Sequence, residues 1–137
     1  MLKRYIKAFT LVEIMLVVII IGALSAMIIP RLAGRGEQAK VKIARSDIEA
    51  NIPTALKLYE LDNGIFPTTV QGLNALRTRP SSASSQNWNG PYLEKEPIDP
   101  WGRAYVYASP GEHRPDYDLS SKGKDEASDK DDIVNWQ

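Results

Sequence analysis

The hydrophobic positions are concentrated at the start of the chain, where residues 9–29 form an almost unbroken apolar run. Glu13 is the only charged residue in this run, and three cations precede it at Lys3, Arg4 and Lys7. At about 1.5 Å rise per residue, a helix of this length reaches ~30 Å, the thickness of a hydrocarbon core. The pattern predicts a membrane-spanning helix with its N-terminus in the cytoplasm and the rest of the chain on the outer side.

A cleaved secretory signal peptide is the main alternative for this segment. Signal peptides have an apolar region of about 7 to 15 residues that ends in small residues at a cleavage site. Here the uncharged stretch alone runs from Ile14 to Ile29 and is followed by Pro30 and Arg31. The length and the flanking residues favour a helix that is retained.

Glu13 is unusual because a carboxylate inside hydrocarbon costs several kcal/mol. One explanation is that the side chain extends to the cytoplasmic interface, where water solvates it. Another is that it meets a cationic partner only when subunits assemble. A free α-amino group created at Phe9 would be such a partner.

The second pattern is a helical period that continues beyond Pro30 to Asn63 and Gly64. Apolar residues recur at steps of three and four and predict one amphipathic helix on a small domain; they are Val41, Ala44, Ile48, Ile52, Ala55 and Tyr59. Helix-breaking residues lie along the same axis, namely Gly22, Pro30, Gly34, Gly36 and Pro53. Each is either a tolerated kink or a point where the helix melts locally when it leaves the bilayer. Gly22 and Pro30 are the preferred positions for such melting over Pro53, since both lie at the transition out of the membrane.

The remainder of the chain has shorter and weaker patterns. A turn at Pro67 is followed by a predicted short helix over Val70 to Leu76, and residues 79–91 are too rich in Ser, Asn, Gly and Pro for regular structure. Residues 104–108 and 117–120 are the best strand candidates. We therefore expect an α+β fold in which a long N-terminal helix packs on a small antiparallel β-sheet.

Composition removes several classes of function. The chain has 137 residues, 17 Lys and Arg against 17 Asp and Glu, one His and no Cys. A net charge of zero gives no global electrostatic basis for nucleic-acid binding. There is no thiol, and His113 sits in a Pro/Gly-rich turn where we expect a surface residue without a fixed carboxylate partner. The chain is predicted not to be an enzyme.

An acidic segment near the C-terminus is the most informative polar feature. Five carboxylates fall between residues 125 and 132, and an apolar group at Ile133, Val134 and Trp136 follows. Such a run is either a solvated surface or a loop for a hard cation such as Ca²⁺, which takes six to eight oxygen ligands. The spacing is not that of an EF-hand. A bound cation would stabilise a loop that no disulfide can hold.

The N-terminal residues carry a resemblance to a known family. A short basic leader followed by the motif FTLVEI and a long apolar helix resembles the type IV pilin-like family. The resemblance implies that a prepilin peptidase cuts between Ala8 and Phe9, that Phe9 is then N-methylated, and that Glu13 acts in assembly. The chain departs from the family in having Ala8 where Gly is usual.

The rest of the chain narrows the resemblance. Residues 61–76, 91–113 and 117–136 are similar to the major pseudopilins of type II secretion systems, so the likeness covers nearly the whole chain. It implies a C-terminal calcium loop in which side chains of Asp125, Asp131 and Asp132 and backbone carbonyls of Lys122 and Ser128 bind the ion. The chain departs from the family between Asp125 and Asp132, where EASDKD replaces a Gly-rich stretch.

This resemblance implies a cleaved leader at 1–8, a transmembrane and assembly helix at 9–30 and a periplasmic pseudopilin domain at 31–137. The protein would be a single-pass inner-membrane subunit that polymerises into a helical pseudopilus and helps drive folded exoproteins through the outer-membrane secretin. Its implied partners are other copies of itself, minor pseudopilins, the inner-membrane assembly platform and the prepilin peptidase. The alternatives are a type IV or competence pilin and a membrane-anchored calcium-binding module that does not polymerise.

Overall fold

In the computed structural model, residues 9–82 and 85–136 are described, apart from the side chains of residues 29–33. The leader at 1–8, including Ala8, lies outside the described residues. The chain divides into two compact units, residues 1–38 and 39–137. Helix α1 (Leu11–Ser46) runs through Gly22, Pro30, Gly34 and Gly36 without interruption.

The helical interruption in this structure lies just before Pro53, and local melting at Gly22 and Pro30 on leaving the bilayer stays a prediction. A π-helical turn, η1 (Asp47–Asn51), separates α1 from α2 (Ile52–Asn63). Proline has no N–H to donate, and its ring crowds the carbonyl four residues earlier, so the backbone widens ahead of it. Helix α2 ends as predicted at Gly64, whose positive φ of 81° closes the helix with a bond to the Glu60 carbonyl.

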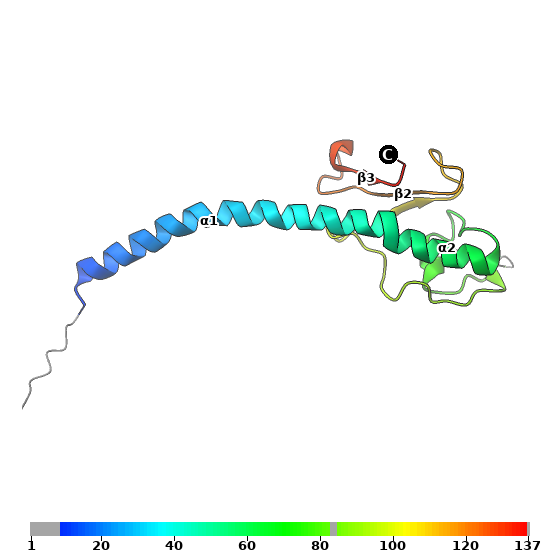
Figure 1. The fold of residues 1–137 in the computed structure, drawn as a ribbon, viewed down its shortest axis with the longest axis horizontal. Coiled ribbons are helices and arrows are strands. Elements are labelled where there is room, and N and C mark those ends of the chain that lie inside the picture. The colour runs from blue at the N-terminus through cyan, green and yellow to red at the C-terminus, as the bar shows by residue number, and fades with distance from the viewer. Residues whose placement is uncertain (1–8, 83–84, 137) are drawn as a thin grey trace, which may run out of the picture. The chain divides into compact units, whose positions relative to one another are not determined.

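A three-stranded antiparallel sheet accompanies the helix in the 39–137 unit (Figure 1). Its strands are β1 (Val106–Ala108), β2 (Asp118–Ser121) and β3 (Ile133–Val134), in the order β1-β2-β3. Tyr107 pairs with Leu119 and Ser121 with Ile133. The two strands predicted from sequence are confirmed, and the apolar residues Ile133 and Val134 supply the third.

The predicted short helix at 70–76 is only partly present. Residues 69–72 form turns, and a 3-10 turn, η2, spans Leu73–Leu76. Gly72 has a positive φ of 60° immediately before η2, which ends any continuous helical path through this segment. A second 3-10 turn, η4 (Asp129–Asp131), lies in the acidic segment.

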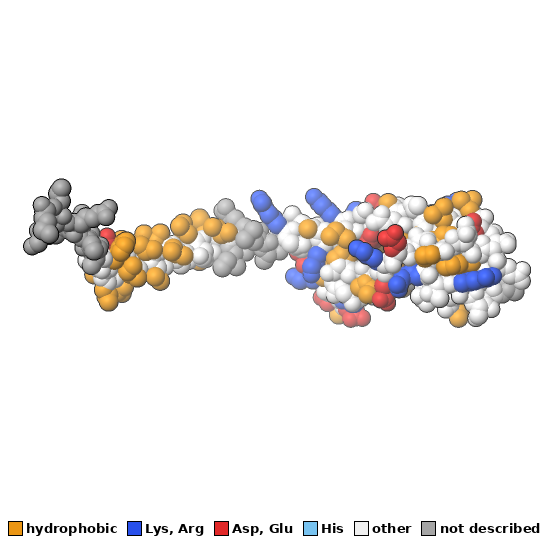
Figure 2. Space-filling view, turned by 90° about the horizontal axis from the view of Figure 1, so that it is seen from below, with side chains coloured by type: hydrophobic (Ala, Val, Ile, Leu, Met, Phe, Trp, Pro, Cys, Tyr) orange, Lys and Arg blue, Asp and Glu red, His pale blue; other side chains and the backbone are white. Residues whose placement is uncertain are grey.

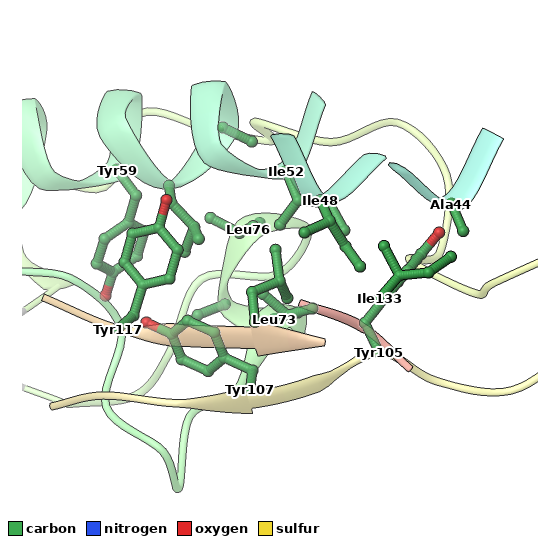
Figure 3. Packing of buried hydrophobic residues seen from close by; sticks show 14 residues of the cluster. Ala44, Ile48, Ile52, Tyr59, Leu73, Leu76, Tyr105, Tyr107, Tyr117 and Ile133 are labelled. Atoms are coloured by element: carbon green, nitrogen blue, oxygen red, sulfur yellow. The ribbon is translucent and has the colours of Figure 1, made fainter. Parts of the chain in front are cut away.

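The hydrophobic core lies between the helix and the inner face of the sheet (Figure 3). Every position of the helical period from Ala44 to Tyr59 that was predicted to face inward is buried. Three tyrosines lie together at one end of this core: Tyr59 from α2, Tyr107 from β1 and Tyr117 from just before β2. Tyr105 reaches across the core boundary and donates a hydrogen bond of 2.8 Å to Asp47, the first residue of η1.

Candidate functional site

The apolar segment of α1 packs against no other part of the chain that the structure describes. Its 18-residue stretch Leu11–Ile28 is long and apolar enough to cross a membrane, and none of it is buried. Figure 2 shows hydrophobic side chains along this stretch. Burying an exposed large aliphatic side chain is worth about 1.5 to 3 kcal/mol. The stretch therefore needs lipid or other helices around it.

Glu13 takes a role at the start of this helix that the sequence interpretation missed. Its Oε2 atom accepts hydrogen bonds from the backbone N–H of Thr10 (3.2 Å) and from the Thr10 hydroxyl (3.3 Å), and the Thr10 hydroxyl accepts from the Glu13 N–H (3.2 Å). This is the reciprocal arrangement of a capping box. The signal was present in the sequence as a Thr followed three residues later by a Glu. Phe9, beside it, is 79% exposed.

The acidic C-terminal segment begins where β2 ends. Gly123 has a positive φ of 62°, and a Cβ there would collide with the carbonyl oxygen of Asp131. The backbone N–H of Asp125 donates to Asp131 Oδ2 at 2.8 Å. This bond lowers the pKa of Asp131 below its ordinary value, against an opposing effect of burial. The structure thus brings the 123–125 turn and Asp131 together.

The other predicted calcium ligands lie in the same loop, where each makes its own hydrogen bond or ion pair. Asp125 Oδ1 accepts from the Ala127 N–H at 3.1 Å, and the Ser128 hydroxyl accepts from the Lys130 N–H at 3.4 Å. The Lys122 ammonium lies 2.8 Å from Asp132 Oδ2 and 3.3 Å from Asp129 Oδ1. Among the residues described, no three Asp, Glu or His side chains form a ready-made metal cluster.

One observation nevertheless fits a hard cation. Asp132 Oδ1 is buried and accepts no hydrogen bond within the described structure. A buried carboxylate oxygen without a partner is costly, and oxygen ligands are what Ca²⁺ prefers. The oxygen atoms that this loop offers to a metal ion, from carboxylates and backbone carbonyls, are thus of the chemical type that Ca²⁺ binds.

A buried polar network supports the beginning of the loop from below. Asp99 is 3% exposed, and its Oδ2 accepts from the Ser121 hydroxyl at 2.8 Å, while Oδ1 accepts from the N–H groups of Trp101 and Arg103. Arg103 donates to the carbonyl of Gly123. These contacts fix the backbone at 121–123. The long-range contact between Asp99 and Ser121 was not predictable from spacing.

His113 has a fixed carboxylate partner, contrary to expectation. Its Nδ1 lies 2.8 Å from Asp118 Oδ2, and its ring stacks on Trp136 at 4.2 Å between centroids. Burial alone would raise the pKa of Asp118, but hydrogen bonds from the His113 ring and from the N–H groups of residues 112–114 hold it below its ordinary value. The group connects the β1–β2 turn to the C-terminus. It contains no nucleophile and reads as structural.

An exposed apolar helix that continues into a small α+β unit is the architecture of a pilin-like protein. The family model of the type II secretion system protein G matches residues 31–136, and that of the prokaryotic N-terminal methylation motif matches residues 3–29. The chain belongs to the type II secretion system protein G family.

Individual relatives agree. The chain is 47% identical to the type II secretion system core protein G of Pseudomonas aeruginosa over 141 aligned positions, which cover 99% of each chain. It is also 47% identical to that of Escherichia coli K12, covering 95% of this chain and 90% of the relative. The crystal structure of the major pseudopilin from the type 2 secretion system of enterohaemorrhagic E. coli superposes with a TM-score of 0.65 at 35% identity, covering 78% of this chain and 95% of the other. The predicted family and fold class are confirmed.

Proposed function

We propose that this chain is the major structural subunit of a type II secretion pseudopilus, which polymerises in the periplasm and helps drive folded exoproteins through the outer-membrane secretin. The observation that carries the proposal is the near-complete alignment with core protein G relatives, at 47% identity over 99% of each chain. The family is one of structural subunits, which argues against an enzyme. The same matches favour a pseudopilin over a type IV or competence pilin.

The apolar helix supplies the physical basis of assembly. In the precursor, lipid covers Leu11–Ile28, and in the filament the helices of other copies replace lipid. In the membrane-inserted precursor, the N-terminus would lie in the cytoplasm and the 39–137 unit in the periplasm. Within one chain, the Glu13 carboxylate accepts hydrogen bonds from the N–H and hydroxyl of Thr10. In the filament it would also pair with the free amine of Phe9 from an adjacent copy.

Processing by a prepilin peptidase would create that amine. We place the cut between Ala8 and Phe9, followed by methylation of the new N-terminus, and the methylation-motif match over residues 3–29 supports this assignment. Intact mass measurement of the chain purified from membranes tests it. A chain that begins with N-methyl-Phe9 is expected, whereas a retained leader would contradict the assignment.

Amine-reactive crosslinking in native membranes tests polymerisation. The wild-type chain should give a ladder of multimers and restore secretion to a strain that lacks its own subunit. Glu13→Gln should remain in the membrane fraction but lose the ladder, whereas Glu94→Gln, at an exposed position of the other unit, should retain it. A wild-type chain that crosslinks only as a monomer would contradict the proposal and favour the non-polymerising module. Minor pseudopilins and the inner-membrane assembly platform are the further partners we propose.

We also propose that the C-terminal loop binds calcium. Asp125, Asp131 and Asp132 would contribute side chains, and Lys122 and Ser128 backbone carbonyls; the buried, unpaired Oδ1 of Asp132 supports this set. When bound, the ion would neutralise the carboxylates and stabilise the loop. The test is thermal unfolding of the full chain in detergent micelles with calcium and with chelator. A calcium-dependent rise in melting temperature that Asp125→Ala abolishes is expected, and identical curves for the wild type would refute calcium binding.

A further inference from the structure

Lys122 stands out in the acidic loop because its side chain bridges two of the loop's carboxylates. Its Nζ lies 2.8 Å from Asp132 Oδ2 and 3.3 Å from Asp129 Oδ1. The Asp132 side chain is only 14% exposed, whereas that of Asp129 is 89% exposed. The contact with Asp132 is therefore the one that is shielded from solvent, and shielding strengthens an ion pair.

The backbone on either side of Lys122 is held without its ammonium group. Ser121 is fully buried and bonds to Asp99, and the Gly123 carbonyl accepts from Arg103. The turn at Gly123 packs against the carbonyl of Asp131. Removing the charge of Lys122 while keeping an unbranched side chain should thus leave the turn intact.

The ammonium satisfies only half of the Asp132 carboxylate. Oδ2 accepts from Lys122, while Oδ1 is buried and accepts no bond within the described residues. A lysine brings one charge and acts as a donor, whereas carboxylates bind Ca²⁺ through one oxygen or through both. A divalent cation could therefore bind both oxygens of Asp132, whereas Lys122 pairs with only one of them.

We propose that Lys122 is the resident counter-cation of the acidic loop and competes with a divalent cation for the Asp132 carboxylate. The second half of this statement rests on the calcium binding proposed above. In the metal-free loop, Lys122 offsets part of the negative charge of Asp129 and Asp132 and, as the residue that follows β2, links that strand to η4. When a divalent ion binds through both oxygens of Asp132, the Lys122 side chain must leave Oδ2, so the lysine lowers the affinity of the loop for that ion.

Two other lysines of the same loop provide matched controls. Lys124 and Lys130 are exposed, and neither ammonium pairs with a carboxylate among the residues the structure describes. Replacing either removes the same unit of positive charge from the loop. Any general electrostatic gain in calcium affinity is then common to all three variants, and only Lys122→Met adds the release of Asp132.

The experiment uses the full chain in detergent micelles and compares wild type, Lys122→Met, Lys122→Arg, Lys124→Met and Lys130→Met. Calcium dissociation constants come from calorimetric titration, and melting temperatures are recorded with chelator and with saturating calcium. Lys122→Met should bind calcium about threefold or more tightly than the two control variants, the size expected from losing a partly screened ion pair. With chelator it should melt below both controls, and saturating calcium should remove that deficit. Lys122→Arg should stay close to wild type.

The outcomes separate this inference from the calcium proposal. If Lys122→Met matches Lys124→Met and Lys130→Met in both affinity and metal-free melting temperature, the role of Lys122 is refuted. If no variant binds calcium, the calcium proposal and the competition both fail. In that case a metal-free melting temperature of Lys122→Met below both controls would still support the resident counter-cation, and one equal to them would refute it.

Discussion

The imidazole of His113 and the carboxylate of Asp118 are hydrogen-bonded, with Nδ1 2.8 Å from Oδ2. His113 lies in the turn before β2, and Asp118 is the first residue of that strand. The same carboxylate accepts bonds from the N–H groups of Glu112, His113 and Arg114. Trp136, near the C-terminus, stacks on the imidazole of His113. One aspartate therefore organises the turn and, through the histidine, the C-terminus.

Replacing Asp118 tests this organisation through its pH dependence. The pKa of Asp118 is lowered in the folded chain, so its contribution to stability is fully present above the unfolded value of about 3.9 and disappears as pH falls through the folded pKa. Asp118→Asn should thus lower the melting temperature by several degrees at neutral pH, and the difference from wild type should narrow below about pH 4. Glu112→Gln, at the exposed neighbour, is the control. A difference that is independent of pH would show that the carboxylate charge is not the cause.

The capping of α1 by Thr10 and Glu13 allows the two roles of Glu13 to be separated. Thr10→Val removes the hydroxyl that caps the helix, at a cost of about 0.5 to 2 kcal/mol in helix stability, but retains the carboxylate. If Glu13 acts between subunits, Thr10→Val should keep the crosslinked ladder that Glu13→Gln loses. Equal loss of the ladder in both variants would mean that assembly depends on the polar groups at the helix start in general, and not specifically on the Glu13 charge. Quantitative blotting of crosslinked native membranes distinguishes these results.

Leu56 and Leu58 give a matched test of the core, because they lie two residues apart in α2 and therefore on different faces of the helix. Leu56 is fully buried, whereas Leu58 is 47% exposed. Leu56→Ala should lower the free energy of unfolding by about 2 to 5 kcal/mol, and Leu58→Ala by less than about 1 kcal/mol. Urea titration of the full chain in micelles, followed by tryptophan fluorescence, measures both. Similar losses of unfolding free energy in the two variants would contradict the finding that α2 buries the face that carries Leu56 and exposes the face that carries Leu58.

The sequence was sufficient where periodicity reports burial directly. Ala44, Ile48 and Tyr59 were predicted to face inward and are buried, and Gly64 ends the helix as its position suggested. The π-helical turn before Pro53 was missed because a proline indicates that a helix is disturbed but not how the backbone adapts. The strands were found one or two residues from their actual bounds.

The polar contacts of the candidate site were much less predictable. The acidic loop was identified from composition, but the Lys122 to Asp132 contact depends on the turn at Gly123 and on its support by Asp99 and Arg103. His113 was assigned no partner, since nothing in a Pro/Gly-rich turn reveals which strand residue it will meet. Spacing reports neighbours on one element, whereas these bonds join elements that only folding brings together.

The bond from Tyr105 to Asp47 connects β1's leading segment to the π-helical turn across 58 residues of sequence, at 2.8 Å. Burial and the bond to Asp47 raise the pKa of Tyr105 far above its ordinary value, so the hydroxyl remains a donor at neutral and mildly alkaline pH. Tyr105→Phe should therefore lower the free energy of unfolding by about 1 to 3 kcal/mol, the range for hydrogen bonds to charged groups, equally at pH 7 and pH 9. In a double-mutant cycle with Asp47→Asn, a coupling energy of at least about 0.5 kcal/mol is expected for residues in direct contact. A coupling near zero would mean that the effect of removing the hydroxyl does not come from its bond to Asp47, and that η1 is held by its own helical bonds and by Asn51, whose amide donates to the other oxygen of Asp47.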